Sequence, residues 1–357
     1  MFYDRTDRGQ ESGTADDLPY ARAVARHLGL PLEVVTVDAV RMAEGLERMV
    51  AQLDEPLSDP APFNVLQISR AARERGIKVL LAERGATICS RATAGTLRSG
   101  STAGCVCCRA RSVAVWNWRP PVSISARHSF GARRDYFAAR SSTETIASST
   151  ISSGSAREEL HRLYTDEVRA ALDGAQAVRP LLDFLEPLPE SVEPLERMLA
   201  LEQRFFLADH NLLYMDKMSM AVGVELRVPL LAPSLVELAA AIPARFKQRG
   251  FQGKWILRRA MAQDLPREIL FRPKTGFGAP VRRWLKRELR PLLEDILSPA
   301  SLRRRGLFDP KAVQSLLQAN EDGRTDAAYT VLALLYVELW CREYLDAQAV
   351  SAPAFKH

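Results

Sequence analysis

The stretch LADHNLLYMDKMSMAVGVELRVP, residues 207–229, combines apolar residues at helical spacing with closely set charges. The polar residues within it are Asp209, His210, Asn211, Asp216, Lys217, Glu225 and Arg227. A solvated helix would gather such residues on one face, but here they alternate with leucine, methionine and valine. We therefore predict that some of them are buried in pairs or line a cleft. A core helix with paired internal charges and a functional cleft both satisfy the pattern.

Two stretches carry a family resemblance. LLYMDKMSMAVGVELRVPLL resembles the asparagine synthetase synthase-domain signature D-[RK]-x-S-M-A-x-x-x-E-x-R-x-P-F-L-D, departing from it at Leu230 and Ala232. GKWILRRAM (253–261) and LPREILFRPKTGFGAPVRRWL (265–285) are similar to the family's G-K-x-x-L-R, L-P-x-x-I and R-x-K-x-G-F-x-x-P-x-x-x-W-L. The resemblance covers about residues 17–82 and 157–345.

The chain before residue 83 reads as alternating helices and strands. Apolar stripes predict helices over 17–28, 40–54 and 64–75, with Gly29 and Gly76 as the ends of the first and third. Residues 31–37 predict a strand, and IKVLLA (77–82) predicts a buried one. This order predicts an α/β fold with a parallel sheet. The resemblance implies that residues 1–82 keep part of a nucleotide-binding sheet of the adenine nucleotide α-hydrolase type, followed by a mainly helical domain over 157–345 and a tail over 346–357.

Residues 83–156 fit neither part. From Arg84 to Ala156 there are 21 Ser or Thr, ten Arg, one Leu and four of the five cysteines. Neither helical nor alternating periodicity persists there. Cys105, Cys107 and Cys108 lack the second pair or nearby His of a zinc site, so we predict no metal site. A low-complexity Ser/Arg linker is one interpretation.

A change of reading frame is the other interpretation of this segment. The family strand that matches IKVLLA ends in S-G-x-G-x-D-[DE]-L-F-x-G-Y, whose acidic residues hold magnesium, but the chain continues as AERGATICSRATAG (82–95). Codons formed from the last base of one residue and the first two of the next, from Gly85 to Gly95, allow G-D-D-L-F-x-G-Y-R-R. Loss of one base near Ala82 would suffice, and coincidence is the alternative. We expect residues 83–156 to be out of frame and unpacked, since they bury too little apolar surface to offset ordering.

The resemblance implies an ATP-dependent amidoligase. The family uses ATP and magnesium to adenylate aspartate, and ammonia from a glutaminase domain then displaces AMP to give asparagine and pyrophosphate. The chain has neither that domain nor the S-G-G-x-D-S-S phosphate cradle, so we expect it to begin inside the synthase domain and to be inactive or impaired. Other carboxylate acceptors, a non-catalytic helical interaction module and a pseudogene-like fragment stay open.

The resemblance assigns the main catalytic role to Lys274, which would neutralise charge on the phosphates; a surface lysine is the alternative. Arg272, Gly276 and Phe277 would shape its loop. Lys254, Arg258 and Asp216 are structural or phosphate-facing. Glu225 and Arg227 are expected to form a buried ion pair that would be costly to break.

Charge and hydropathy narrow the choice of partners. The segment 84–156 carries a net charge of +8, whereas the whole chain carries +6, so the rest of the chain carries −2. We therefore expect small-molecule substrates and no nucleic acid. There is no apolar run of about 18 residues, so no membrane partner is expected. The polar N-terminus does not resemble a signal peptide, and we expect a cytoplasmic protein with reduced thiols. The oligomeric state stays open.

Overall fold

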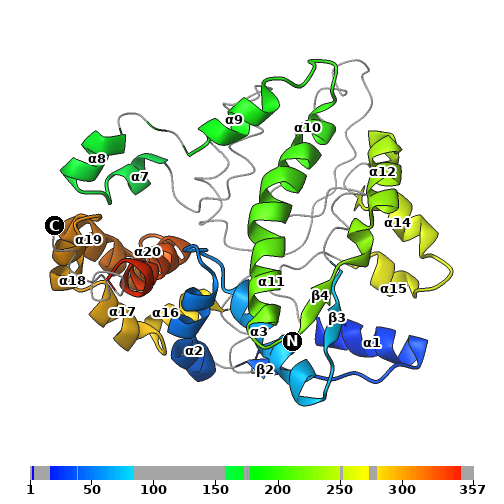
Figure 1. Ribbon diagram of the computed structural model, residues 1–357, viewed down its shortest axis with the longest axis horizontal. Helices are drawn as coiled ribbons and strands as arrows, with labels where there is room; N and C mark the ends of the chain where they lie inside the picture. Colours follow the sequence, from blue (N-terminus) through cyan, green and yellow to red (C-terminus); the bar gives the residue numbers. More distant parts are fainter. Residues whose placement is uncertain are drawn as a thin grey trace, which may run out of the picture.

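The computed structural model describes residues 2–3, 17–37, 39–83, 157–172, 175, 177–249, 252–272 and 280–346. The expected out-of-frame segment (84–156), Lys274, Gly276, Phe277 and the end of the tail lie outside these residues. Within them, the protein is mixed α/β and rich in helix (Figure 1). No helix in the described ranges has the length and apolarity needed to cross a membrane.

The N-terminal elements alternate between strand and helix, as the sequence predicts. They are β1 (Phe2–Tyr3), α1 (Leu18–Leu28), β2 (Thr36–Val37), α2 (Ala39–Gln52), α3 (Ala61–Glu74) and β3 (Val79–Leu81). Gly29 ends α1 with φ 64°, a left-handed conformation that glycine adopts without a steric penalty. The predicted strand over 31–37 is shorter in the structure, because only Thr36 and Val37 form a ladder.

The central elements are three short helices, a continuous helical run and a following strand. They are α7 (Arg157–His161), α8 (Asp166–Leu172), α9 (Arg179–Leu185), α10 (Pro194–Leu201), the π-helix η3 (Glu202–Leu212), α11 (Leu213–Met220), β4 (Glu225–Arg227) and the 3₁₀ turn η4 (Pro229–Leu231). Figure 1 shows α10 and α11 as one continuous rod through the middle of the molecule. The expected helix over the opening stretch is therefore confirmed as far as Met220, and Glu225 and Arg227 lie on a strand.

The C-terminal elements are short helices and one hairpin. They are α12 (Pro233–Ala241), α13 (Ala244–Lys247), β5 (Gln248–Arg249), β6 (Gln252–Gly253), α14 (Trp255–Ala260), α15 (Arg267–Leu270), α16 (Val281–Lys286), α17 (Arg290–Ile296), α18 (Pro299–Arg305), α19 (Pro310–Glu321), α20 (Ala328–Cys341) and the π-helix η5 (Arg342–Asp346). Side chains cap two of the helices: Ser298 accepts from the Ser301 N–H and Asp309 from the Ala312 N–H. The mainly helical nature of this region is as expected.

The strands of the described residues form three separate pairs. β1 pairs with β2 and β3 with β4, both in parallel, while β5 and β6 form an antiparallel hairpin. The prediction of parallel pairing is confirmed, but the described strands do not join into one sheet. The prediction that 77–82 is a buried strand is wrong for the described chain, since Val79 is 42% and Leu81 72% exposed. Among the described strands β3 has only β4 as a neighbour, so the two form a small isolated pair.

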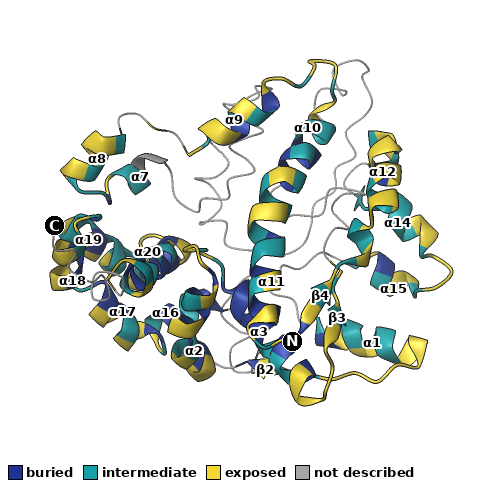
Figure 2. Ribbon diagram, viewed as in Figure 1, coloured by how far each residue is buried: buried dark blue, intermediate teal, exposed yellow. Residues whose placement is uncertain are grey.

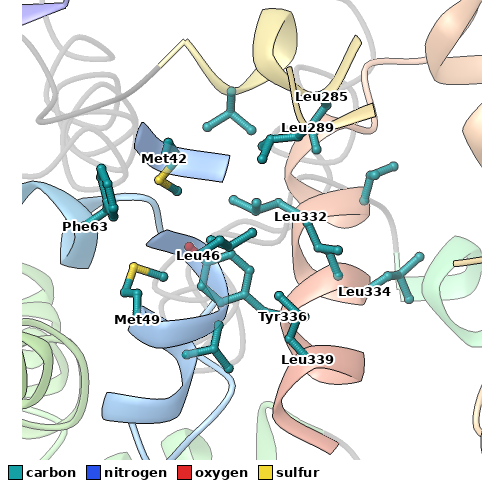
Figure 3. Packing of buried hydrophobic residues seen from close by; sticks show 14 of the residues in the cluster. Met42, Leu46, Met49, Phe63, Leu285, Leu289, Leu332, Leu334, Tyr336 and Leu339 are labelled. Carbon is teal, nitrogen blue, oxygen red and sulfur yellow. The ribbon is translucent and has the colours of Figure 1, made fainter. Parts of the chain in front are cut away.

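The main core forms where α2, α3, α11, α16, α17 and α20 meet. Figure 3 shows Met42, Leu46 and Met49 of α2 facing Leu332, Tyr336 and Leu339 of α20. Helix α20 is apolar on most of its surface, and such a helix is stable only when neighbours surround it. Leu332, Leu335, Tyr336 and Leu339 of this helix are buried, whereas Tyr329 is 39% exposed. Figure 2 shows the contrast between these buried helices and the exposed helix α8.

Candidate functional site

The first signature stretch places few of its charges inside the protein. Met215 and Met218 of α11 are buried in the same main core as Trp284 and Leu285 of the second signature. Asp216 faces solvent, and Lys217 is half-buried. Of the polar residues in this stretch that we expect to be buried, Asn211 is the most clearly buried, with 5% of its surface exposed. The two signatures therefore meet through their apolar residues.

Two polar residues of this stretch, Lys217 and His210, contact the loop between α2 and α3. Lys217 forms an ion pair with Asp54, whose hydrogen bond and charge raise the pKa of the lysine. His210 Nε2 lies 3.2 Å from Asp59 Oδ2, and Phe206 stacks on the imidazole ring. Both contacts join residues of η3 and α11 to a loop about 150 positions earlier, which begins with the sequence Asp-Glu-Pro at residues 54–56.

Helix α20 holds the same loop through two further hydrogen bonds. The Tyr336 hydroxyl donates to the Asp59 carbonyl at 3.1 Å, and Trp340 Nε1 donates to the Asp54 carbonyl at 2.5 Å. Asp54 has φ 59°, a conformation that is uncommon for a residue with a side chain, and these contacts fix it. Burial raises the pKa of Tyr336, and the nearby Asp59 carboxylate raises it further. No periodic pattern in the sequence signals this clamp on the α2–α3 loop, because the clamp depends on single contacts between distant residues.

Glu225 and Arg227 form the predicted ion pair, with Arg227 Nε 2.8 Å from Glu225 Oε1. The expectation that the pair is buried is wrong, because the two side chains are 57% and 62% exposed. The residues alternate along a strand, so both side chains point to one solvent-facing side of β4. Water screens such a pair, and it contributes little to stability.

The pairing of β3 with β4 positions the carboxyl ends of both strands side by side. Leu81 lies opposite Arg227, and the Ala82 N–H donates to the Arg227 carbonyl at 2.8 Å. In open parallel sheets, ligands bind beyond the carboxyl ends of the strands. The residues that follow Ala82, where the family carries its acidic motif, therefore start at the edge where a ligand is expected.

A second polar cluster lies between α1 and the helices α14 and α15. Arg272 forms an ion pair with Asp17, and its guanidinium carbon lies 5.1 Å from the centre of the Tyr20 ring. Arg258 Nε donates to the Gly253 carbonyl at 2.9 Å. Burial lowers the pKa of Arg258, and the positive charge of Arg272 lowers it further. The two guanidinium groups are thus close enough for their charges to interact, and the Asp17 carboxylate already neutralises Arg272.

The chain turns sharply before this cluster. Lys254 has φ 56° and precedes the first residue of α14, so the backbone there is left-handed. Arg272 is the last described residue before 273–279, which include Lys274, Gly276 and Phe277. The structure therefore describes the approach to the expected catalytic loop, and the roles of those three residues stay predictions.

The candidate residues form two groups. Lys217 and His210 grip the α2–α3 loop, whereas Arg258 and Arg272 lie against α1, and no ion pair or hydrogen bond links the two groups among the described residues. Nor do the described side chains include three or more His, Cys, Asp or Glu that could together hold a metal ion.

Comparison with known proteins agrees with the signatures. A putative glutamine-hydrolysing asparagine synthetase of Mycobacterium tuberculosis, and one of Mycobacterium bovis, are each 28% identical over 363 residues, which cover 96% of this chain and 51% of the relative. The glutamine-hydrolysing asparagine synthetase 1 of Bacillus subtilis is 28% identical over 150 residues, 42% of this chain and 23% of the relative. The chain spans about half the length of the mycobacterial relatives. The model of the asparagine synthase family matches residues 6–342, which shows that the chain belongs to this family.

Proposed function

We propose that this chain is the synthase part of an ATP-dependent carbon–nitrogen ligase that converts aspartate and ammonia, released from glutamine, into asparagine, AMP and pyrophosphate. Membership of the family supports ATP dependence and small-molecule substrates. Arg272 immediately precedes the expected catalytic loop, and Arg258, which donates to the Gly253 carbonyl at 2.9 Å, adds a second positive charge to this region. Lys274, two residues after Arg272, would then reach the phosphates of the nucleotide.

The same proposal holds that the chain as encoded is impaired. The observation that carries it is the register of β3 and β4, which starts the segment after Ala82 at the carboxyl edge of the strands. The acidic metal-binding motif of the family belongs at this edge, and the chain reads AERGATICSRATAG there. The proposal assigns no step to magnesium.

Activity is tested in a pair of proteins expressed with all the coding sequence that precedes Met1 at the locus. One keeps the present reading of residues 83–156, and the other has one base restored near codon 82 and compensated near codon 150. AMP release from ATP with aspartate and ammonia is measured in both. We expect turnover from the restored protein and a barely detectable rate from the present one. Equal and robust turnover in both would refute the impairment.

The role of Lys274 is tested in the restored protein. Lys274→Ala removes the charge that would stabilise the phosphates in the transition state, and losing one such group commonly lowers kcat by about 10²–10³-fold. Lys311→Ala is the matched control, since Lys311 is an exposed lysine on α19. Unfolding in urea shows whether either variant has lost stability. Parent-like turnover by Lys274→Ala would show that this residue is a surface lysine.

A further inference from the structure

Helix α1 contacts the chain around α15 at both of its ends. At its N-terminal end, Asp17 forms an ion pair with Arg272, a residue 255 positions later. At its C-terminal end, His27 Nε2 lies 3.1 Å from the Asp264 carbonyl oxygen, just before α15. Figure 1 shows α15 above α1 at the right of the view. Helix α1 therefore lies along the segment that leads to the expected catalytic loop.

The Asp17 side chain binds Arg272 and does not cap its own helix. Asp17 is the N-cap residue of α1, a position where an aspartate commonly accepts a hydrogen bond from the backbone of the first turn. Its side chain makes no such bond and instead accepts one from Arg272. The positive end of the helix dipole favours an ionised carboxylate at this position. The sequence thus places a negative charge at the start of α1 that serves a distant arginine.

Tyr20, three residues further along α1, holds the same guanidinium group. The guanidinium carbon of Arg272 lies 5.1 Å from the centre of the Tyr20 ring, within the range of a cation–π contact. The backbone before Arg272 is fixed as well, because the Phe271 N–H donates to the Arg267 carbonyl at 3.0 Å at the end of α15. Arg272 is therefore held both at its side chain and at the residue that precedes it.

The charge of Asp17 also determines whether Arg272 can stay in this position. Arg258 lies close enough that the positive charge of Arg272 lowers its pKa. Arg258 is itself held, since its Nε donates to the Gly253 carbonyl at 2.9 Å. Without the carboxylate, Arg272 would face a fixed charge of the same sign, and repulsion would favour another position of its side chain. Loss of the Asp17 charge therefore displaces Arg272 in addition to removing one contact.

We propose that Asp17 and Tyr20 are positioning residues for the proposed ligase reaction, because they hold Arg272 and thereby fix the start of the chain that carries Lys274. This inference rests on the proposed function. Two residues extend over at most about 7 Å, so the Cα atom of Lys274 lies within that distance of the Arg272 Cα atom. A displacement of about 1 Å can cost a catalytic group about 10²-fold in rate. A change in α1 therefore lowers turnover through Arg272.

Trypsin measures the hold on this segment in the full chain. It cleaves the bond after Lys274 but not the bond after Arg272, because Pro273 follows that arginine. The initial rate at which peptides beginning at Thr275 appear, followed by mass spectrometry, reports local opening of the native protein. In Asp17→Asn this rate should rise about three- to fivefold, the factor expected for the loss of a part-buried ion pair.

Matched variants make the trypsin test specific. Asp17→Glu keeps the charge and Tyr20→Phe keeps the ring, so both should be cleaved at close to the parent rate, whereas Tyr20→Leu should be cleaved faster. Glu237→Gln, at an exposed carboxylate on α12, is the control and should have no effect. Cleavage after Lys311 on α19 should be the same in all variants, which excludes general unfolding. Equal cleavage after Lys274 in Asp17→Asn and the parent would overturn the proposal.

The second measurement uses the restored protein. Asp17→Asn should lower kcat for AMP release by about 10- to 100-fold with little change in the KM for ATP, because the loss falls on the transition state. Asp17→Glu should keep most of the rate. In a Lys274→Ala background Asp17→Asn should have little further effect, since both changes remove the same contribution. Fully additive losses would show that Asp17 does not act through Lys274, and would contradict the proposal.

The two measurements separate this inference from the proposed function. If the restored protein has no turnover, the proposed function fails, and faster cleavage of Asp17→Asn after Lys274 still supports the hold that Asp17 exerts on this segment. If the restored protein turns over and Asp17→Asn changes neither the cleavage rate nor kcat, the positioning role fails and the proposed function stands.

Discussion

At the scale of single residues, the strongest polar network lies at the end of α20, away from both signature stretches. Glu338 is 3% exposed and accepts from Arg305 at 2.8 and 3.3 Å, from Arg342 at 3.4 Å and from the Ser301 hydroxyl at 3.3 Å. Hydrogen bonds from Arg305 also lower the pKa of Asp346. Arg305 also pairs with Asp346 and Arg342 with Asp295, so each arginine keeps a second carboxylate, and loss of the Glu338 charge removes only their buried partner.

We predict that Glu338→Gln destabilises the protein by roughly 1–3 kcal/mol, the cost typical of losing a buried hydrogen-bonding partner, because Asp346 and Asp295 still neutralise the two arginines. The free energy of unfolding in urea measures it. Glu294→Gln is the control, since Glu294 pairs with Arg290 on the surface at 2.8 Å and should matter little. If both substitutions had the same small effect, the network would not be a source of stability.

Cys341, in the same region, is the one cysteine among the described residues and is 2% exposed. Burial raises the pKa of its thiol above the ordinary 9.0. A raised folded pKa means that the neutral thiol contributes stability below about pH 9, and that this contribution is lost as pH rises through the folded pKa. We therefore predict that iodoacetamide at pH 8 leaves Cys341 unmodified in the native protein and labels it after unfolding. Peptide mass spectrometry separates it from the other cysteines, and rapid native labelling would contradict its burial.

At the scale of elements, the sequence predicted the helices better than the strands. Helix α1 ends at the predicted Gly29, and α2 and α3 fall within a few residues of their apolar stripes. The strand at 31–37 and the burial of 77–82 were overestimated, since a strand depends on neighbours that may be distant in sequence. The exposure of the Glu225–Arg227 pair has a related cause. The two residues lie on the strand β4 and not on a helix, and both side chains face solvent there.

The packing of α2 against α3 gives the element-scale prediction. A methyl group added at Gly45 would lie 2.5 Å from the Phe63 ring, which is fully buried. Gly45→Ala should therefore destabilise the protein by about 1–2 kcal/mol, since overpacking outweighs the gain in helix propensity. Thermal or urea unfolding measures the change.

A double-mutant cycle tests that explanation. In a Phe63→Leu background the ring is absent, and Gly45→Ala should become neutral or stabilising. If the cost of Gly45→Ala were the same in both backgrounds, contact with the Phe63 ring would not be its cause.

At the scale of the whole molecule, family membership followed from two short signatures, and the geometry of the site did not. The signatures contain buried residues such as Met215, Met218 and Trp284, whose apolar character is visible in the sequence. The clamp on the α2–α3 loop joins Asp54 to Lys217 and Asp59 to His210 and Tyr336, and no local pattern reports such distant pairs. The interaction between the charges of Arg258 and Arg272 has no signal in the sequence for the same reason.

The central claim concerns residues 83–156, where a family chain departs from its family. We propose that this segment is read out of frame, which would explain its single leucine, its ten arginines between Arg84 and Ala156 and its clustered cysteines. The family match extends from residue 6 to 342 and so includes positions on both sides of the segment.

The nucleotide sequence of the gene from codon 80 to codon 158 tests this claim most directly. The account predicts that codons shifted by one base from Gly85 to Gly95 spell G-D-D-L-F-x-G-Y-R-R, and that the shifted frame continues open until the original frame returns near codon 150. A shifted frame that spells another sequence, or that meets a stop codon at once, would contradict it and make the segment a genuine Ser/Arg-rich insertion.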